Sequence, residues 1–183
     1  DITLIETVGV GQSETAVHSM VDFFLLVQIA GAGDELQGIK RGIMEMADSI
    51  IINKADGNNI TRAELAKVQL QNALHLFPPH ESGVEPKVMT CSAYEKTGIK
   101  EIWKNILHYC SETQQSKYFD IRRNEQAKYW MYETIDEQLR NRFYQSQKEQ
   151  IKEAEEKVQH NEESSFAAAF RLLDNYFKED TKL

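Results

Sequence analysis

Residues 49–70 read SIIINKADGNNITRAELAKVQL, and this stretch decides the fold. It opens with a short, continuously apolar run at 49–52, changes to a polar turn at Asn53, and continues as a helical pattern over 62–76. Continuously apolar runs are typical of strands that are covered on both faces, whereas strands with one solvated face alternate apolar and polar residues. The stretch therefore predicts a buried strand, a polar loop and a helix.

The same strand–loop–helix unit recurs on both sides of this stretch. Further apolar runs predict strands at 2–5, 23–29 and 87–91. Helical patterns predict helices over 14–21, 38–47 and 99–111, and Thr61 with Glu64 predicts a capping box at the start of the helix over 62–76. Repeated units of this kind give an α/β fold with a parallel, doubly wound sheet, in which ligands bind at the carboxyl ends of the strands.

The chain changes character after Gly98. All nine glycines and all three prolines lie at or before this residue, so neither residue type marks a turn beyond it. Apolar residues at helical spacing follow from about Ile121, and a later stripe at i, i+4, i+7 and i+11 consists of Phe166, Phe170, Leu173 and Phe177. We predict an α/β domain over 1–112 and an all-α extension of long helices over 113–183.

The composition excludes several function classes. The net charge of −8 argues against a sequence-independent nucleic-acid surface, which requires a basic stripe. No apolar run reaches the roughly 18–20 residues of a membrane span. Two cysteines are too few for a disulfide framework, and five histidines show no ligand-like spacing. We therefore predict a cytoplasmic protein with reduced cysteines, no nucleic-acid or membrane partner, and no histidine-rich metal site.

The polar loop after the central strand, Asn53-Lys54-Ala55-Asp56, fits the NKxD pattern that reads guanine. The Asp56 carboxylate can accept hydrogen bonds from guanine N1–H and the exocyclic amine together, a charge-assisted bidentate pair that adenine cannot make. The Lys54 stem can lie over the base, and the Asn53 side chain can tie neighbouring loops together. Asn and Asp also favour ordinary turns, but the position directly after a buried strand favours guanine recognition.

Two other predicted strand ends carry residues suited to the same ligand. Glu6 is placed to hold a water of Mg²⁺, Gly9 lets a backbone N–H approach a γ-phosphate, and Gln12 can orient an attacking water. Ser92-Ala93 follows the last predicted strand, where backbone N–H groups can contact the guanine carbonyl oxygen. Each pattern alone is also compatible with a glycine-rich turn or an ordinary strand end, and the shared position at strand ends is what favours nucleotide binding.

Two longer stretches are specific enough to indicate a family. ETVGVGQSE at 6–14 and QIAGAGDELQGIKRG at 28–42 resemble the MeaB/ArgK family of SIMIBI-class P-loop GTPases, which includes the human methylmalonic aciduria type A protein. The resemblance continues through 53–57, 91–93 and 98–103 and covers essentially residues 1–112. It implies a protein that binds GTP or GDP with Mg²⁺ and hydrolyses GTP. It also implies a chaperone of an adenosylcobalamin-dependent methylmalonyl-CoA mutase, which gates cofactor loading and protects the enzyme.

The resemblance also implies roles for individual residues. Switch II would contain Glu6, Gly9 and Gln12, with Glu6 and Gln12 catalytic and Glu6 holding Mg²⁺ through a water. An additional switch that communicates with the mutase would include Asp34, Gln37 and Lys40. Guanine would be read by Asn53, Lys54 and Asp56, with the base covered by Ser92, Ala93 and Tyr94. The helical tail would form a homodimer, which gives the apolar stripe of the last helix a partner surface. Burial of this stripe within the chain's own core, the more common role of an aromatic stripe, stays open as the alternative.

The sequence departs from the family in one respect, because no GxxxxGK[ST] phosphate loop occurs in it. In the family this loop precedes the part that matches, and the chain does not begin with Met. We therefore expect a C-terminal piece of a longer GTPase that is inactive by itself. Three alternatives stay open: a nucleotide-free module for dimerisation and partner binding, a nickel-insertion GTPase, and the arginine/ornithine transport-linked ATPase or kinase role described for some relatives.

Overall fold

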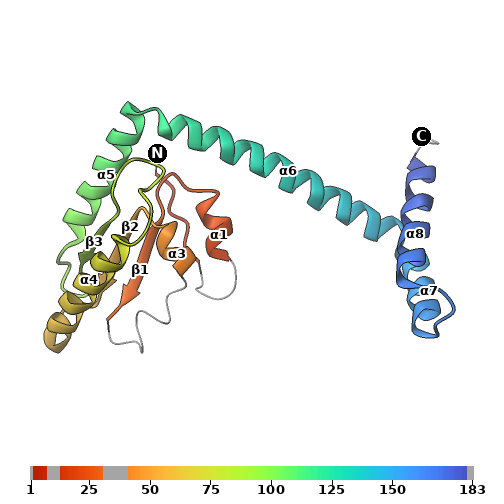
Figure 1. Ribbon diagram of the computed structural model, residues 1–183, viewed down its shortest axis with the longest axis horizontal. Coiled ribbons are helices and arrows are strands. Elements are labelled where there is room, and N and C mark those ends of the chain that lie inside the picture. The colour runs from red at the N-terminus through yellow and green to blue at the C-terminus, as the bar shows by residue number, and fades with distance from the viewer. Residues whose placement is uncertain (1, 8–12, 31–40, 181–183) are drawn as a thin grey trace. The chain divides into compact units, whose positions relative to one another are not determined.

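The computed structural model describes residues 2–7, 13–30 and 41–180 (Figure 1). In these ranges the elements are α1 (Ser13–His18), β1 (Leu25–Ile29), α3 (Arg41–Glu45), β2 (Ser49–Asn53), the short 3₁₀ helix η1 (Gly57–Asn59), α4 (Ile60–Leu74), β3 (Lys87–Thr90), α5 (Ile99–Gln115), α6 (Tyr118–Ser146), α7 (Lys148–Gln159) and α8 (Ser165–Asp180). The chain divides into two compact units, Asp1–Ala127 and Lys128–Leu183. Helix α6 runs through the boundary between them.

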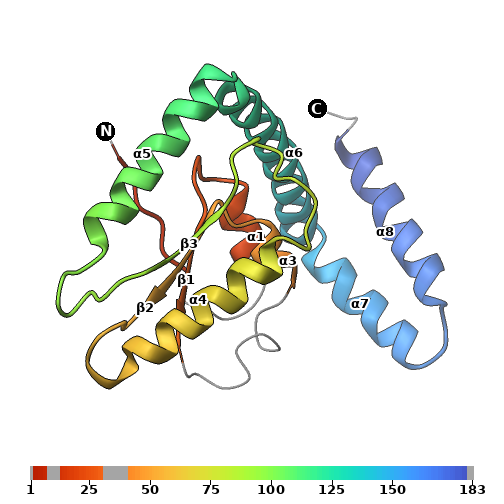
Figure 2. The same cartoon turned by 60° about the vertical axis from the view of Figure 1, so that its left-hand side comes forward.

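Three parallel strands in the order β1-β2-β3 form the sheet of the first unit. In the register of the sheet, Ile51 of β2 lies opposite Val27 of β1 and Met89 of β3. Helix α4 covers one face of the sheet and α5 the other (Figure 2). The predicted α/β class with a parallel sheet is therefore confirmed.

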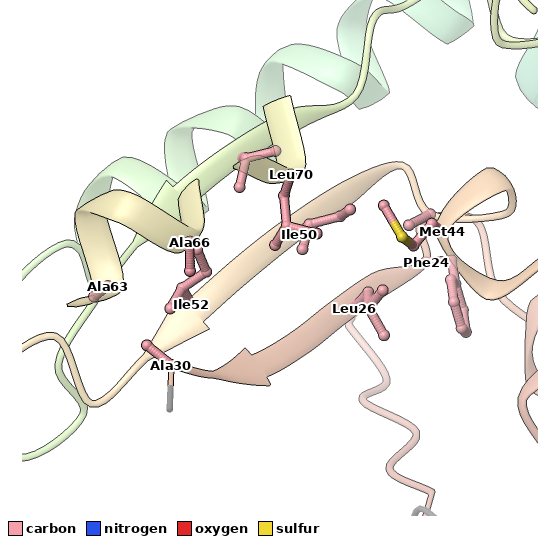
Figure 3. Packing of buried hydrophobic residues seen from close by; sticks show 11 residues of the cluster. Phe24, Leu26, Ala30, Met44, Ile50, Ile52, Ala63, Ala66 and Leu70 are labelled. Atoms are coloured by element: carbon pink, nitrogen blue, oxygen red, sulfur yellow. The ribbon is translucent and has the colours of Figure 1, made fainter. Parts of the chain in front are cut away.

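Each face of the sheet buries its own apolar cluster. On one face, β2 packs against α4 through Ile50, Ile52, Ala63, Ala66 and Leu70 (Figure 3). On the other face, Ile51 packs against Ile102 of α5. Successive residues of a strand point to opposite faces, so a strand that is covered on both faces needs an apolar residue at every position. This is why the central run is continuously apolar.

Two local predictions are wrong. Residues 2–5 form no strand, and Ile2 and Leu4 are 68% and 90% exposed. An apolar run supplies only side chains, whereas a strand also needs a hydrogen-bonding neighbour. The capping box is absent too, because α4 begins at Ile60, so Thr61 lies inside the helix. Glu64 instead accepts a hydrogen bond of 2.8 Å from the Thr90 hydroxyl at the end of β3.

The first compact unit extends to Ala127, beyond the predicted division at residue 112. The reason is a buried polar cluster that holds the start of α6 against the sheet. Arg122 of α6 donates to Asp48 at 3.3 and 3.5 Å and to the Tyr109 hydroxyl at 3.1 Å. Asp48 also accepts a 2.7 Å bond from the Phe24 amide, just before β1. The first turns of α6 therefore belong to the sheet unit.

The segment after Gly98 consists of long helices, as predicted. Its turns use residues other than glycine in the left-handed region, with φ of 64° at Lys117 before α6 and 57° at Asn161 before α8. In the second unit, α7 and α8 pack through Ala154, Ala168 and Leu172. None of the helices within the described ranges has the length and hydrophobicity that a membrane span requires.

Candidate functional site

The candidate site lies where β2 and β3 end. Because these strands are adjacent and parallel, the loops that follow them leave the sheet at the same edge. Two main-chain bonds join the loops: the Cys91 amide donates to Ile52 O, and the Ala55 amide donates to Cys91 O, each at 2.9 Å. Segments far apart in the sequence thus form one surface.

The Asn53 side chain is the centre of the bonds that hold this surface. Its amide oxygen accepts from the Lys54 amide at 2.8 Å and from the Ala93 amide at 3.1 Å. The Cys91 thiol lies 3.6 Å from the same oxygen, and burial raises the pKa of this thiol, which keeps it a neutral donor. The predicted tie between the two loops is therefore present.

The Asp56 carboxylate is oriented by the opposite loop. The hydroxyl of the fully buried Ser92 donates to Asp56 Oδ2, and the same hydroxyl oxygen accepts a 3.0 Å bond from the Glu95 amide. An ionised carboxylate has about four lone-pair sites. The Ser92 bond therefore fixes the direction of Asp56 and leaves it capacity for further donors.

The loop 92–97 is closed by its own backbone. Ser92 and Thr97 exchange two main-chain bonds of 3.1 Å. Gly98 follows with φ of 77°, and a Cβ at this position would lie 2.5 Å from Thr90 O. Glycine is thus required where α5 begins against the end of β3. Tyr94 in this loop is 91% exposed, so the loop presents an aromatic ring beside the two tied strand ends.

The surface combines one oriented carboxylate with the exposed side chains of Lys54 and Tyr94, which carry an apolar stem and a flat ring. The Lys54 backbone has φ of 60°, and its carbonyl accepts a 2.8 Å bond from Asn59 Nδ2. Such a surface suits a planar ligand with two adjacent donors on one edge. Within the described ranges, no group of three His, Cys, Asp or Glu side chains is arranged to hold a metal ion.

The structure brings together six of the predicted site residues: Asn53, Lys54, Asp56, Ser92, Ala93 and Tyr94. Glu6 is exposed and lies outside any strand or helix. The remaining predicted residues lie outside the described ones: Gly9, Gln12, Asp34, Gln37 and Lys40.

Sequence reasoning missed three residues that build the site. Cys91 contacts the oxygen of Asn53, Thr97 closes the loop, and Gly98 permits the close approach of α5 to β3. Of these, only Gly98 gave a local signal, since a glycine directly before a helical pattern indicates an unusual backbone conformation. The roles of Cys91 and Thr97 depend on partners that no spacing rule identifies.

Comparison with known proteins relates these features to a family. Residues 1–148 match the family model described as "Methylmalonyl Co-A mutase-associated GTPase MeaB". The chain is 44% identical over 144 residues to GTPase ArgK of Escherichia coli (strain K12), a match that covers 79% of this chain and 44% of that protein. It is 42% identical over 175 residues to the mitochondrial methylmalonic aciduria type A homolog of Mus musculus, which covers 94% of this chain and 42% of that protein.

A solved structure agrees with this relationship. The crystal structure of LAO/AO transport system kinase matches with a TM-score of 0.71 and 36% identity, and the match covers 93% of this chain and 55% of that one. The chain spans about half the length of the curated relatives it matches.

Proposed function

The chain belongs to the MeaB family of methylmalonyl-CoA mutase-associated GTPases, and from this premise we propose that it recognises the guanine base in a protein that binds and hydrolyses GTP. One observation carries the proposal: Ser92 holds the Asp56 carboxylate in place, and Asn53 ties the same two loops together. A carboxylate oriented before the ligand arrives has less conformational freedom to lose on binding. The tied loops therefore favour affinity as well as specificity.

Guanine rather than adenine fits the chemistry of Asp56. Guanine offers N1–H and an exocyclic amine side by side, so a single carboxylate can accept from both. Adenine offers an unprotonated N1 at that position, which would leave the carboxylate desolvated and unpaired. An unsatisfied charged group costs more than the roughly 1–3 kcal/mol of a neutral one. The proposed ligand is therefore GTP or GDP rather than an adenine nucleotide.

We assign the steps of GTP hydrolysis that follow base recognition to residues of the segment 6–12. Glu6, whose carboxylate is exposed, is the described residue that would hold a water of Mg²⁺, an ion that neutralises phosphate charge when GTP is bound. We assign contact with the γ-phosphate to the Gly9 amide and orientation of the attacking water to Gln12. No GxxxxGK[ST] stretch occurs among the 183 residues. We therefore propose that this chain by itself binds GTP only weakly.

The proposed partner is an adenosylcobalamin-dependent methylmalonyl-CoA mutase, for which the protein would act as a chaperone. The support is the description of the matched family, which names association with this mutase, and the name of the mouse relative. We assign the contact with the mutase to a switch that includes Asp34, Gln37 and Lys40. Co-elution of the complete gene product with such a mutase, dependent on the bound nucleotide, is the measurement that checks this assignment.

Homodimerisation through the tail is proposed from the exposure of α8. Phe166, Phe170 and Phe177 are 76%, 67% and 60% exposed in the single chain. Soluble monomers rarely expose a large contiguous apolar patch. A second copy of α8 would cover this face, because a two-fold interface places the same patch on both partners.

The guanine proposal is tested by Asp56→Asn in the complete gene product. Two hydrogen bonds to a charged group contribute about 1.5–3 kcal/mol each, so GTP affinity should fall by roughly 10²–10⁴-fold. Affinity for xanthosine triphosphate should rise, because its C2 oxygen suits the amide donor of Asn. Asp136→Asn, on the exposed surface of α6, is the matched control and should change nothing. Equal turnover of ATP and GTP by the unsubstituted protein would contradict the proposal and favour the transport-linked kinase alternative.

A further inference from the structure

The first turns of α6 grip the segment that connects α1 to β1. The Gln126 side-chain amide donates to Val21 O at 2.9 Å and to His18 O at 3.4 Å. The Arg123 guanidinium makes a bidentate pair with the Asp22 carboxylate, with both bonds at 2.7 Å. We call these contacts of Arg123 and Gln126 with residues 18–22 the α1–α6 grip.

The grip is ordered but accessible to solvent. The Arg123 guanidinium lies 4.4 Å over the Phe119 ring, which orients it toward Asp22. The side chains of Arg123 and Asp22 are 58% and 36% exposed. Exposed ion pairs typically contribute only about 0.2–1 kcal/mol to stability, and bidentate arginine–carboxylate geometry is the case in which that contribution is measurable. Modest forces can therefore make and break the grip without unfolding the unit.

A buried anchor lies beside this exposed grip. Arg122, the residue before Arg123, is almost fully buried and donates to Asp48 and the Tyr109 hydroxyl. Asp48 is buried as well and accepts a hydrogen bond from the Phe24 amide. A buried charge pair is costly to break, because either partner alone would be left uncompensated. The same turn of α6 is thus fixed to the sheet on one side and held by weaker bonds to the end of α1 on the other.

The end of α1 is close in sequence to the residues that sense the nucleotide. Helix α1 begins at Ser13, directly after the stretch 6–12 that we assign to switch II. Helix α6 is uninterrupted from Tyr118 to Ser146, past the unit boundary after Ala127. An uninterrupted helix can carry a displacement at one end along its length, because its i→i−4 hydrogen bonds resist local distortion.

We propose that the α1–α6 grip is a joint through which the nucleotide bound at the switch segment changes α6, and that α6 carries this change into the tail unit. This inference rests on the proposed function, because the signal it transmits is the difference between bound GTP and bound GDP. The joint has two states, with the grip closed or released around the fixed anchor at Arg122. A ligand shifts such an equilibrium only by its differential affinity for the two states, which suits a joint made of weak bonds.

Hydrogen exchange on the complete gene product tests the joint. The protein is measured without nucleotide, with GDP, and with a non-hydrolysable GTP analogue, after fluorescent-nucleotide titration has established binding. In the unsubstituted protein, exchange in peptides from 118–146 should differ between the GDP and GTP-analogue states. In Arg123→Ala/Gln126→Ala, exchange in 13–22 should be about two- to tenfold faster without nucleotide, the factor expected for losing an exposed ion pair and a side-chain hydrogen bond.

The same variant should lose the nucleotide-dependent difference in α6 but keep its affinity for nucleotide, because neither residue lies in the base site. Arg171→Ala is the matched control, since it removes another bidentate pair, with Glu163 at 3.0 and 2.7 Å, inside the tail. This control should keep the difference in α6. If near-UV circular dichroism shows that the double variant does not fold, the double variant Asp22→Asn/Gln126→Met replaces it, because it removes the same ion pair and the same side-chain hydrogen bonds.

The outcomes separate the joint from the proposed function. Nucleotide binding with identical α6 exchange in both nucleotide states would overturn the joint alone. A difference in α6 that survives in the double variant would overturn it too, because the signal would then take another route. Absence of any guanine-nucleotide binding would overturn the proposed function, and with it the joint.

Discussion

Gly98→Ala probes the junction between β3 and α5 that holds the candidate site together. Gly98 has φ of 77°, in the left-handed region, and an added Cβ would lie 2.5 Å from Thr90 O and 3.1 Å from Cys91 Cα. Both neighbours are backbone atoms, so they cannot move away as the end of a flexible side chain could. Substitution should therefore force the end of β3 and the start of α5 apart.

The magnitude combines two separate costs. An alanine in the left-handed region costs about 1–2 kcal/mol, and overpacking against fixed atoms costs about 1–3 kcal/mol more. Gly98→Ala should thus lower the free energy of unfolding of the first unit by about 2–5 kcal/mol. Gly57→Ala separates the two costs, because Gly57 has φ of 50° but nothing within 4 Å of its added Cβ. It should lose only about 1–2 kcal/mol.

Gly42→Ala is the control with the opposite sign. This glycine lies in α3 and also has nothing within 4 Å of the added Cβ. Alanine in a helix interior is about 0.5–1 kcal/mol more stable than glycine, so this variant should be neutral or slightly stabilised. The three variants therefore have a fixed order of stability that does not depend on the absolute values.

Urea unfolding followed by Trp103 fluorescence gives the readout for the first unit. Trp103 lies in α5, and a Trp130→Phe background removes the second tryptophan, which lies in the tail unit. Midpoints at constant m-value report the change in stability. Unfolding of Gly98→Ala within about 0.5 kcal/mol of the parent, the small scatter typical of an ordinary surface substitution, would mean that β3 and α5 do not approach closely. That result would refute the inference of a tightly held loop at 92–97.

Three further predictions address other parts of the molecule. Arg122→Met should cost about 3–5 kcal/mol in urea unfolding, because it leaves the buried Asp48 carboxylate without its guanidinium partner. Burial, aided by Arg122, lowers the pKa of His18 below 6.5, so the unfolded state takes up the proton first. Stability should therefore fall as the pH drops from 6.5 toward the folded-state pKa of His18. In His18→Gln the urea midpoint should depend less on pH over the same range. Phe170→Glu/Phe177→Glu should convert a dimer to a folded monomer in light scattering, whereas Asn175→Glu should leave it dimeric; a monomeric parent would contradict the proposed interface.

The sequence was most informative where a residue's role depends on its immediate surroundings. The run at 50–52 indicated a strand covered on both faces, because each residue contacts a different cluster from its neighbour in the strand. Asn53 and Asp56 could be placed at a strand end for a similar reason, since a buried strand must be followed by a turn. The parallel arrangement followed from the alternation of strands and helices, and it set both loops at one edge of the sheet.

The sequence was least informative where a role depends on a distant partner. Asp48 and Arg122 are 74 residues apart, and nothing in either neighbourhood indicates that they pair. This pair is what attaches the start of α6 to the sheet unit. Similarly, the run at 2–5 has the apolar side chains of a strand but no hydrogen-bonding neighbour among the described residues. The capping box at Thr61 and Glu64 failed because α4 begins before Thr61, and the Glu64 carboxylate accepts from the hydroxyl of Thr90 at the distant end of β3.

In the proposed function, the geometry of the two loops separates base specificity from nucleotide affinity. The groups that would select guanine are held by contacts between the ends of β2 and β3, chiefly through Asn53 and Ser92. None of these contacts requires a phosphate, so this surface forms when the sheet folds. Contacts with phosphates, which normally dominate nucleotide affinity, are assigned to other parts of the protein. In the proposed function, substitutions at Asp56 should therefore change which base is bound, whereas substitutions in the α1–α6 grip should change the response of α6 to the bound nucleotide without altering that choice.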